Sequence, residues 1–196
     1  HHIEYQQSKN WAPIAGDGEL TNKTLVILGY GGIGSQVAKI GKAFGMRVTG
    51  IRRNPQDDEH ADEVLGLDRF EELLPLTDYL VLSLPDSSQT RDIINADILE
   101  KLNSSAMIIN VGRGTAINED DLTHALNDGK IAAAALDTTK VEPLDANSSL
   151  WTAKNCFISA HDSAHSLLSL ERAFELFFIN IKNIQNGQPI KNLYSE

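Results

Sequence analysis

Six short apolar runs recur along this 196-residue chain, and their form constrains the fold more than any other feature. The runs are continuous rather than alternating, which is how strands read when helices cover both faces of their sheet. Segments with helical spacing lie between them, so strands and helices alternate as βαβ units. The sequence therefore predicts an α/β fold, a doubly wound parallel sheet in three α/β/α layers. The expected strands are residues 24–29, 47–51, 79–84, 106–111, 131–136 and 155–160.

The segments between the runs carry helix start and stop signals. Asn95 and Asn118 precede two of them and can cap the first-turn amides. Gly45 and Gly129 stand where a helix ends in a left-handed residue. We expect helices at residues 34–44, 96–102 and 119–128.

The two ends of the chain differ from its centre. Residues 1–20 are expected to pack as an arm, and residues 21–163 form the main domain. Residues 164–196 are expected as a tail with one long amphipathic helix, 164–186, which ends at Gly187. That helix has more apolar face than one small sheet requires, so we expect it also to contact something outside this chain.

Charge and cysteine content restrict the partners and the compartment. The chain has 27 acidic and 17 basic residues, a formal net charge of −10 at pH 7, so neither nucleic acid nor an anionic membrane is expected to bind. No signal peptide or membrane-spanning run is expected, and no metal site. The single cysteine, Cys156, is interpreted as a core thiol rather than a nucleophile and favours the reducing cytoplasm.

A glycine motif follows the first expected strand. Gly29, Gly31 and Gly34 form G-x-G-x-x-G between a strand and a helix, the setting in which a Rossmann fold binds a dinucleotide. Gly29 permits the turn, Gly31 admits a pyrophosphate to the backbone, and Gly34 allows close helix–strand packing. Gly32 and Ile33 are expected to line the same site. The alternative is a glycine-rich turn that serves packing alone.

The end of the second expected strand indicates which dinucleotide is bound. An acidic residue there would bind the ribose hydroxyls of NAD, but this sequence has Arg52 and Arg53. Guanidinium groups bind a 2′-phosphate in forked geometry, so we predict that NADP is preferred and NAD possible. The alternative is two solvated arginines in a protein that uses NAD.

Three polar features follow later strands, at the edge where such sheets bind ligands. Arg113 follows the fourth run, Asp137 and Glu142 follow the fifth, and His161 follows the sixth. A cation, carboxylates and an imidazole on successive loops can converge on one crevice.

Several segments in the same order resemble the D-isomer-specific 2-hydroxyacid dehydrogenase family, from about Trp11 onward. They are the glycine loop, residues 83–95, 109–126, 129–137 and 141–144, and the segment around His161. The resemblance implies an NAD(P)-dependent oxidoreductase that acts on a small 2-oxo or D-2-hydroxy acid of the glyoxylate, hydroxypyruvate or phosphoglycerate type. It also implies a homodimer.

The resemblance assigns catalytic roles to three residues. Arg113 would bind the substrate carboxylate and polarise the adjacent carbonyl. His161 would act as general acid–base, since imidazole can give and take a proton near neutral pH. Glu142 would hold His161, because a carboxylate beside an imidazole favours the imidazolium.

The resemblance also implies a set of cofactor contacts. Asp137 would hold the nicotinamide carboxamide, and Val111 and Gly112 would line the nicotinamide. The remaining expected contacts are Leu84 and Pro85 on the adenosine side, with Arg113, His161 and Ser163.

The sequence departs from the family pattern in places. Ala160 replaces a usual proline, Asp162 and Ser163 replace an apolar residue and glycine, and Arg52 replaces the acidic residue. The family's N-terminal part, which builds most of its substrate domain, is missing, so we expect this piece to bind nucleotide but turn over poorly. The alternative function is a nucleotide-sensing binding module of the same family without turnover.

Overall fold

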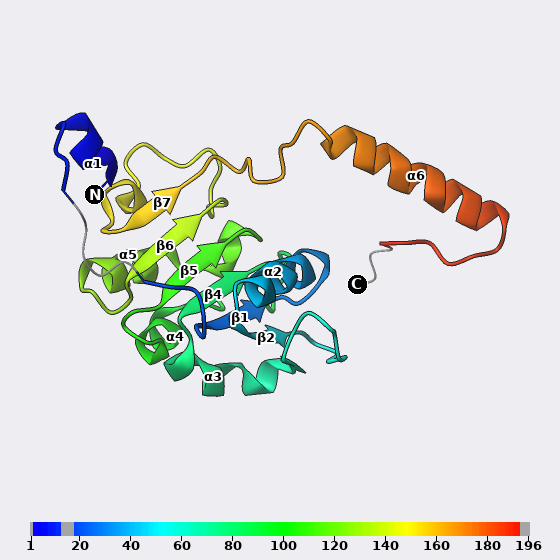
Figure 1. The fold of residues 1–196 in the computed structure, drawn as a ribbon, viewed down its shortest axis with the longest axis horizontal. Coiled ribbons are helices and arrows are strands. Elements are labelled where there is room, and N and C mark those ends of the chain that lie inside the picture. Colours follow the sequence, from blue (N-terminus) through cyan, green and yellow to red (C-terminus); the bar gives the residue numbers. More distant parts are fainter. Residues whose placement is uncertain (1, 13–17, 193–196) are drawn as a thin grey trace. The chain divides into compact units, whose positions relative to one another are not determined.

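In a computed structural model that describes residues 2–12 and 18–192, the strands form one seven-stranded parallel sheet (Figure 1). The strand order is β3-β2-β1-β4-β5-β6-β7, so the chain changes direction across the sheet between β1 and β4. This is the doubly wound Rossmann order, and the predicted fold class is confirmed. The strands are β1 Thr24–Leu28, β2 Arg47–Ile51, β3 Glu63–Leu65, β4 Tyr79–Leu82, β5 Met107–Asn110, β6 Ala133–Leu136 and β7 Cys156–Ile158.

Helices connect most of these strands. The predicted caps are confirmed, because the side chain of Asn95 accepts from Ile98 N and that of Asn118 accepts from Asp121 N. Gly45 and Gly129 have φ of +74° and +71°, the left-handed conformation expected of helix-ending glycines. The α-helices are α1 His2–Gln7, α2 Gly32–Ala43, α3 Phe70–Leu73, α4 Ala96–Lys101, α5 Glu119–Asn127 and α6 Ser169–Gln185.

The structure adds one strand to the prediction and shifts several boundaries, most of all the start of the last helix. The strand β3 was not expected, because its three residues are too short an apolar run to stand out from the polar loop around them. The last helix begins at Ser169 rather than at residue 164. The Ser169 hydroxyl donates to Ala164 O (2.9 Å) and accepts from Ser166 N (3.0 Å), so side-chain hydrogen bonds hold this segment in a turn.

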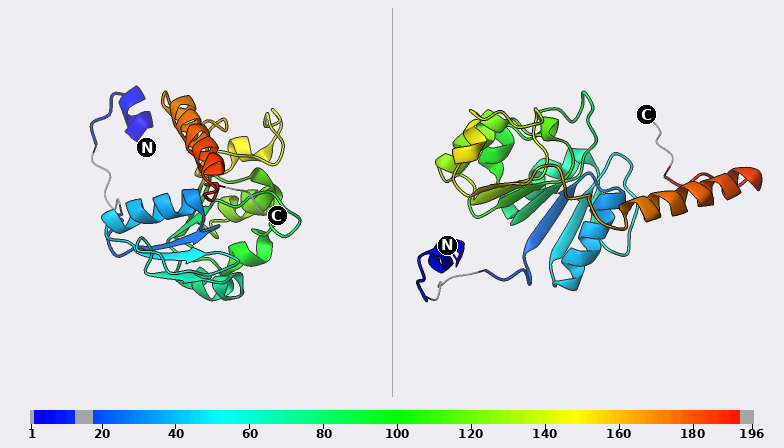
Figure 2. Two further views of the ribbon diagram at one scale, coloured as in Figure 1. Left: turned by 90° about the vertical axis from the view of Figure 1, so that its right-hand side faces the viewer. Right: turned by 90° about the horizontal axis from the view of Figure 1, so that it is seen from above.

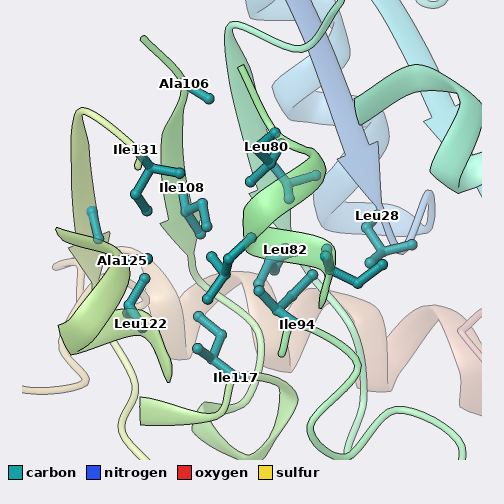
Figure 3. Close-up of a cluster of buried hydrophobic side chains, with 14 of the residues drawn as sticks. Leu28, Leu80, Leu82, Ile94, Ala106, Ile108, Ile117, Leu122, Ala125 and Ile131 are labelled. Atoms are coloured by element: carbon teal, nitrogen blue, oxygen red, sulfur yellow. The ribbon is translucent and has the colours of Figure 1, made fainter. Parts of the chain in front are cut away.

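The alternation of side chains along β1 separates two layers of core. Leu25 and Ile27 pack in the cluster that contains Ala38 of α2, on one face of the sheet. Val26 and Leu28 belong to the larger cluster on the other face, with side chains from α3, α4 and α5 (Figures 2 and 3). Burying such side chains stabilises the fold by about 1.5–3 kcal/mol each. The resulting rigid sheet fixes the loops at its edge.

The chain divides into two compact units, residues 1–158 and 159–196. The sheet lies entirely in the first unit, where α1 falls within the expected arm 1–20; residues 13–17 of that arm lie outside the described residues. The second unit contains α6, where Leu170, Phe174 and Phe177 are exposed. That α6 contacts something outside this chain stays a prediction. Within the described residues no helix is long and apolar enough to span a membrane.

Candidate functional site

The carboxyl ends of five strands lie at one level. Register pairs Leu28 at the end of β1 with Ile51 and with Leu82, and pairs Leu82 with Asn110. Asn110 in turn pairs with Leu136. The loops that follow these strands therefore start side by side at the edge where doubly wound sheets bind ligands.

The glycine motif forms the tight connection from β1 to α2. Gly29 has φ +100°, and a Cβ built on it would lie 2.7 Å from Ser83 O. A Cβ on Gly34 would lie 2.8 Å from Gly29 O. These two positions need glycine for turn geometry and for close packing respectively.

No contact within the chain requires glycine at Gly31 or Gly32. A Cβ on either would meet nothing within 4 Å, so the start of α2 is open. The first amides of a helix have no partner within the helix, and its dipole favours an anion there. The residues at this position fit the pyrophosphate of a dinucleotide.

The end of β2 carries the two arginines. Arg52 is half-buried and its N–H donates to Leu65 O (3.0 Å), while Arg53 is exposed. Asp58 follows in the next loop, and its pKa is lowered, foremost by the His60 N–H (2.9 Å), with the charge of Arg52 adding to the effect. Arg52 therefore has a carboxylate nearby as well as a position suited to a 2′-phosphate.

The side chain of Tyr30, in the glycine loop, is buried against β2. It is 3% exposed and packs so tightly on Gly50 that a Cβ there would lie 2.2 Å from the ring. Burial, foremost, raises the pKa of Tyr30 to about 12, so the phenol stays neutral at physiological pH.

The loop after β5 presents Arg113. The fully buried amide of Asn110 accepts from Gly112 N and donates to Arg113 O, both at 3.0 Å. The Arg113 guanidinium is exposed and Nη1 donates to Gly112 O (2.8 Å). A rigid backbone thus carries a cation that faces solvent.

Glycines on both sides of Arg113 let the neighbouring loops close on it. A Cβ on Gly112 would lie 2.7 Å from Leu84 N, and one on Gly114 would lie 2.0 Å from the carbonyl carbon of Thr139. The loops after β4, β5 and β6 are therefore packed backbone against backbone at this edge. Leu84 and Val111 are half-buried there, and Pro85 is exposed.

The loop after β6 carries the two predicted carboxylates. Asp137 is 6% exposed, and its backbone N–H donates to Asn110 O (2.9 Å). Glu142 lies at the surface and its Oε1 accepts from Thr139 N (3.1 Å). The turn from Thr139 to Glu142 is thus closed by the glutamate itself.

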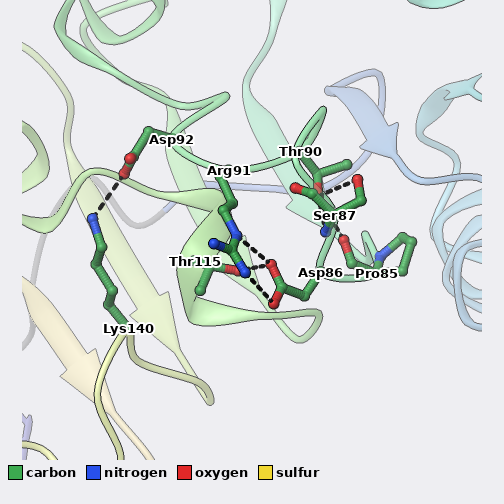
Figure 4. A network of polar contacts seen from close by, with 8 residues as sticks. All are labelled: Pro85, Asp86, Ser87, Thr90, Arg91, Asp92, Thr115 and Lys140. Atoms are coloured by element: carbon green, nitrogen blue, oxygen red, sulfur yellow. Dashed lines mark hydrogen bonds and ion pairs between the residues drawn. The ribbon is translucent and has the colours of Figure 1, made fainter.

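The loop after β4 is fastened to its neighbours by charged side chains (Figure 4). Asp86 accepts two bonds from Arg91, at 3.1 and 3.2 Å, and one from Thr115 Oγ1 at 3.0 Å. Lys140 Nζ donates to Asp92 Oδ1 (3.2 Å), which links the loops after β4 and β6.

The predicted residues divide between the two units. The glycine loop, the arginines, Asp137 and Glu142 share the edge of the sheet in the first unit, whereas His161 and Ser163 belong to the second. His161 is exposed and has φ +53°, an uncommon conformation for a residue other than glycine.

Three residues of the site were missed from the sequence: Asn110, Asp86 and Thr115. Asn110 carried a signal, because it is a polar residue inside an apolar run that reads as a buried strand. Asp86 and Thr115 carried none, since their contact joins residues 29 positions apart.

Other candidate chemistry is not supported. Cys156 is half-buried and packs against the larger core cluster. Burial, foremost, raises the pKa of its thiol to about 11, so little nucleophilic thiolate forms at neutral pH. Among residues 2–12 and 18–192 no cluster of histidine, cysteine and acidic side chains could hold a metal ion.

Comparison with protein families gives one match along most of the chain. A family model described as "D-isomer specific 2-hydroxyacid dehydrogenase, NAD binding domain" matches residues 1–163. The chain is 36% identical over 196 residues to a hydroxypyruvate reductase of Blautia hydrogenotrophica, covering 97% of this chain and 59% of that protein. It is 41% identical over 186 residues to a glyoxylate reductase of Aeropyrum pernix, covering 93% and 55%.

Solved structures agree. A D-isomer specific 2-hydroxyacid dehydrogenase family protein of Aeromonas salmonicida has a TM-score of 0.88 at 36% identity, with 99% of this chain and 62% of that chain covered. An NADPH-dependent glyoxylate/hydroxypyruvate reductase of Sinorhizobium meliloti, in complex with NADP and sulfate, has a TM-score of 0.87 at 27% identity, covering 99% and 62%. The chain thus spans less than two thirds of the length of these relatives.

Proposed function

The chain belongs to the D-isomer-specific 2-hydroxyacid dehydrogenase family, whose NAD-binding domain it contains, and from that premise we propose that the protein interconverts a small 2-oxo acid and its D-2-hydroxy acid. Glyoxylate and hydroxypyruvate are the favoured substrates, with phosphoglycerate-type acids as the other candidates. The names of the similar reductases of Blautia and Aeropyrum support the first pair.

The cofactor binds at the glycine loop. Gly31 and Gly32 leave open the start of α2, where the pyrophosphate would lie, and this observation carries the proposal. Arg52 and Arg53 would bind a 2′-phosphate, so NADP is the preferred cofactor and NAD the second choice. Bound NADPH would supply the hydride.

Arg113 binds the substrate carboxylate. Its exposed guanidinium can take the carboxylate in a forked pair of hydrogen bonds and polarise the neighbouring carbonyl. The contacts of Asn110 to Gly112 and Arg113 support this role, because they fix the backbone from which the guanidinium extends. Asp137 holds the carboxamide end of the cofactor, with Leu84, Pro85, Val111 and Ser163 lining the remainder.

His161 moves the proton. It protonates the carbonyl oxygen in reduction and removes the hydroxyl proton in oxidation, and Glu142 favours its protonated form. The order of the motifs in the sequence supports both assignments. In the full-length protein, replacing His161 with glutamine should reduce turnover of glyoxylate with NADPH at least about a hundredfold. Near-normal turnover of that variant would contradict the assignment of His161. A full-length unaltered protein that binds NADPH yet reduces no 2-oxo acid would favour a sensing module.

Titration calorimetry of this chain with NADPH and then NADH tests the cofactor site. NADPH should bind more tightly, and Arg52→Asp should abolish the preference. Arg47→Asp is the matched control, because it makes the same charge change at the other end of β2. Equal affinities for both nucleotides would overturn the NADP preference, and binding of neither would contradict the cofactor site.

The proposal also includes a compartment and an oligomeric state. The single cysteine favours a cytoplasmic protein, and the family assignment favours a homodimer. Light scattering that finds only monomer would remove the homodimer.

A further inference from the structure

Asp86 joins the loop after β4 to the loop that carries Arg113. Its carboxylate takes Arg91 in a forked pair of bonds (3.1 and 3.2 Å) and accepts from Thr115 Oγ1 at 3.0 Å (Figure 4). The side chains of Asp86 and Arg91 are 40% and 61% exposed, so the ion pair contributes little to the free energy of folding. The Asp86 carboxylate instead affects the geometry of the two loops that its contact with Thr115 connects.

Thr115 lies two residues after Arg113, and the backbone beyond it is already fixed. Asp92 N donates to Thr115 O (2.8 Å) and Ile94 N donates to Ala116 O (3.0 Å). These two bonds hold the backbone at Thr115 and Ala116, on the C-terminal side of Arg113. The contact with Asp86 uses the side chain of Thr115. Together with the hydrogen bond from Asn110 to Arg113 O, it holds the Arg113 segment on both sides.

The same carboxylate affects the charges around Arg113. Hydrogen bonds from Arg91 and Thr115, foremost, with the charges of Arg91 and Arg113, hold the pKa of Asp86 below its ordinary value of 3.8. Asp86 is therefore ionised at neutral pH and lies within electrostatic reach of both arginines. The forked pair engages two of the five N–H donors of Arg91, whereas the bond to Gly112 O engages one donor of Arg113.

We propose that Asp86 is a positioning residue for Arg113: it anchors the Arg113 loop through Thr115 and engages Arg91, which leaves Arg113 to bind the anionic group of the substrate. The inference rests on the proposed role of Arg113 in binding a carboxylate. It assigns the loop after β4 a function in substrate orientation in addition to its expected contact with the cofactor.

Nitrogen relaxation of arginine side chains in this chain tests the proposal. The 15N–1H Nε signal of Arg113, assigned by its loss in Arg113→Lys, should show a restrained side chain, and exposed Arg53 gives the reference for a solvated one. In Thr115→Val the heteronuclear NOE of Arg113 should fall to the Arg53 value, because the isosteric valine has no donor for Asp86. Thr115→Ser keeps the hydroxyl and should retain the unaltered value. Asp86→Ala removes the acceptor and should lower the NOE of Arg113 as Thr115→Val does.

Asp92→Asn provides the matched control, because it removes the negative charge from the Lys140 ion pair of the same loop and leaves Asp86 in place. It should leave the Arg113 signal unchanged. An Arg113 as mobile as Arg53 in the unaltered chain, or one unaffected by Thr115→Val, would overturn the proposal. NADP⁺ affinity, measured on the Thr115, Asp86 and Asp92 variants, should equal that of the unaltered chain. If none of these samples binds NADP⁺, the proposed cofactor site is contradicted instead.

Discussion

Gly114 approaches Thr139 so closely that a Cβ on the glycine would lie 2.0 Å from the carbonyl carbon of Thr139 and 2.1 Å from its oxygen. Both are backbone atoms, which a side-chain rotation cannot move aside. The contact joins the loop of Arg113 to the turn that Glu142 closes on Thr139 N. Two loops expected to hold functional residues are thus fixed against each other by the absence of one side chain.

Gly114→Ala should destabilise the chain. Because backbone must shift to admit the methyl group, the free energy of unfolding should fall by about 1–3 kcal/mol, the range for overpacked sites. Urea denaturation followed by circular dichroism measures it. Gly32→Ala is the control, since its Cβ meets nothing within 4 Å, and it should leave stability unchanged or slightly higher. Equal stability of Gly114→Ala and the unaltered chain would show that the loops can separate freely.

The sequence predicted those elements whose signals are local. Continuous apolar runs predicted six strands, because a strand buried on both faces needs apolar side chains at every position. Asn95 and Asn118 predicted helix starts, since a cap acts within its own first turn. β3 was missed because its three residues pair only with the end of β2, and that pairing is set by the tertiary fold.

The site was predictable only in part, for the same reason. Gly31 and Arg113 stand in motifs that reveal them, whereas the contact of Asp86 with Thr115 depends on how two loops meet. The start of the last helix at Ser169 was decided by a competition between serine side-chain bonds and helix bonds that spacing alone does not resolve.

Gly31→Ala should separate nucleotide binding from folding. Gly31 has φ −122° and ψ −151°, which alanine adopts readily, and a Cβ there meets nothing within the chain. The free energy of unfolding should change by less than about 1 kcal/mol. The methyl group would occupy the space expected for the pyrophosphate, so calorimetry should find NADPH affinity at least about tenfold lower. Unchanged affinity would place the cofactor elsewhere.

Asp58→Asn should increase affinity for NADPH. The carboxylate lies within electrostatic reach of Arg52, so removing its charge should strengthen the attraction of Arg52 for a 2′-phosphate. The effect near the surface should be no more than roughly fivefold in affinity, and it should diminish with added salt. NADH affinity should change less, because NADH lacks the phosphate. Glu59→Gln, in an adjacent and 87% exposed side chain, is the control for net charge.

Acid should destabilise the fold partly through Asp78. Burial is the largest influence on this carboxyl and favours its neutral form. The Thr24 N–H at 2.8 Å and the Lys23 ammonium at 2.9 Å together outweigh it, so the pKa of Asp78 is lower than its ordinary value of 3.8. The unfolded chain then binds this proton at higher pH than the folded chain does. The stabilisation is complete above the unfolded pKa and is lost as pH falls through the folded one.

Urea denaturation between about pH 6 and pH 3 measures this contribution. The free energy of unfolding should fall with decreasing pH. Asp78→Asn should have a shallower slope and be less stable at pH 6 by about 1 kcal/mol, because it loses the charge of the contact to Lys23, whose side chain is partly exposed to solvent. Asp57→Asn, in an exposed loop, should follow the unaltered chain. If Asp78→Asn keeps the full slope, the Lys23–Asp78 pair that fastens the start of β1 to β4 is not what acid breaks.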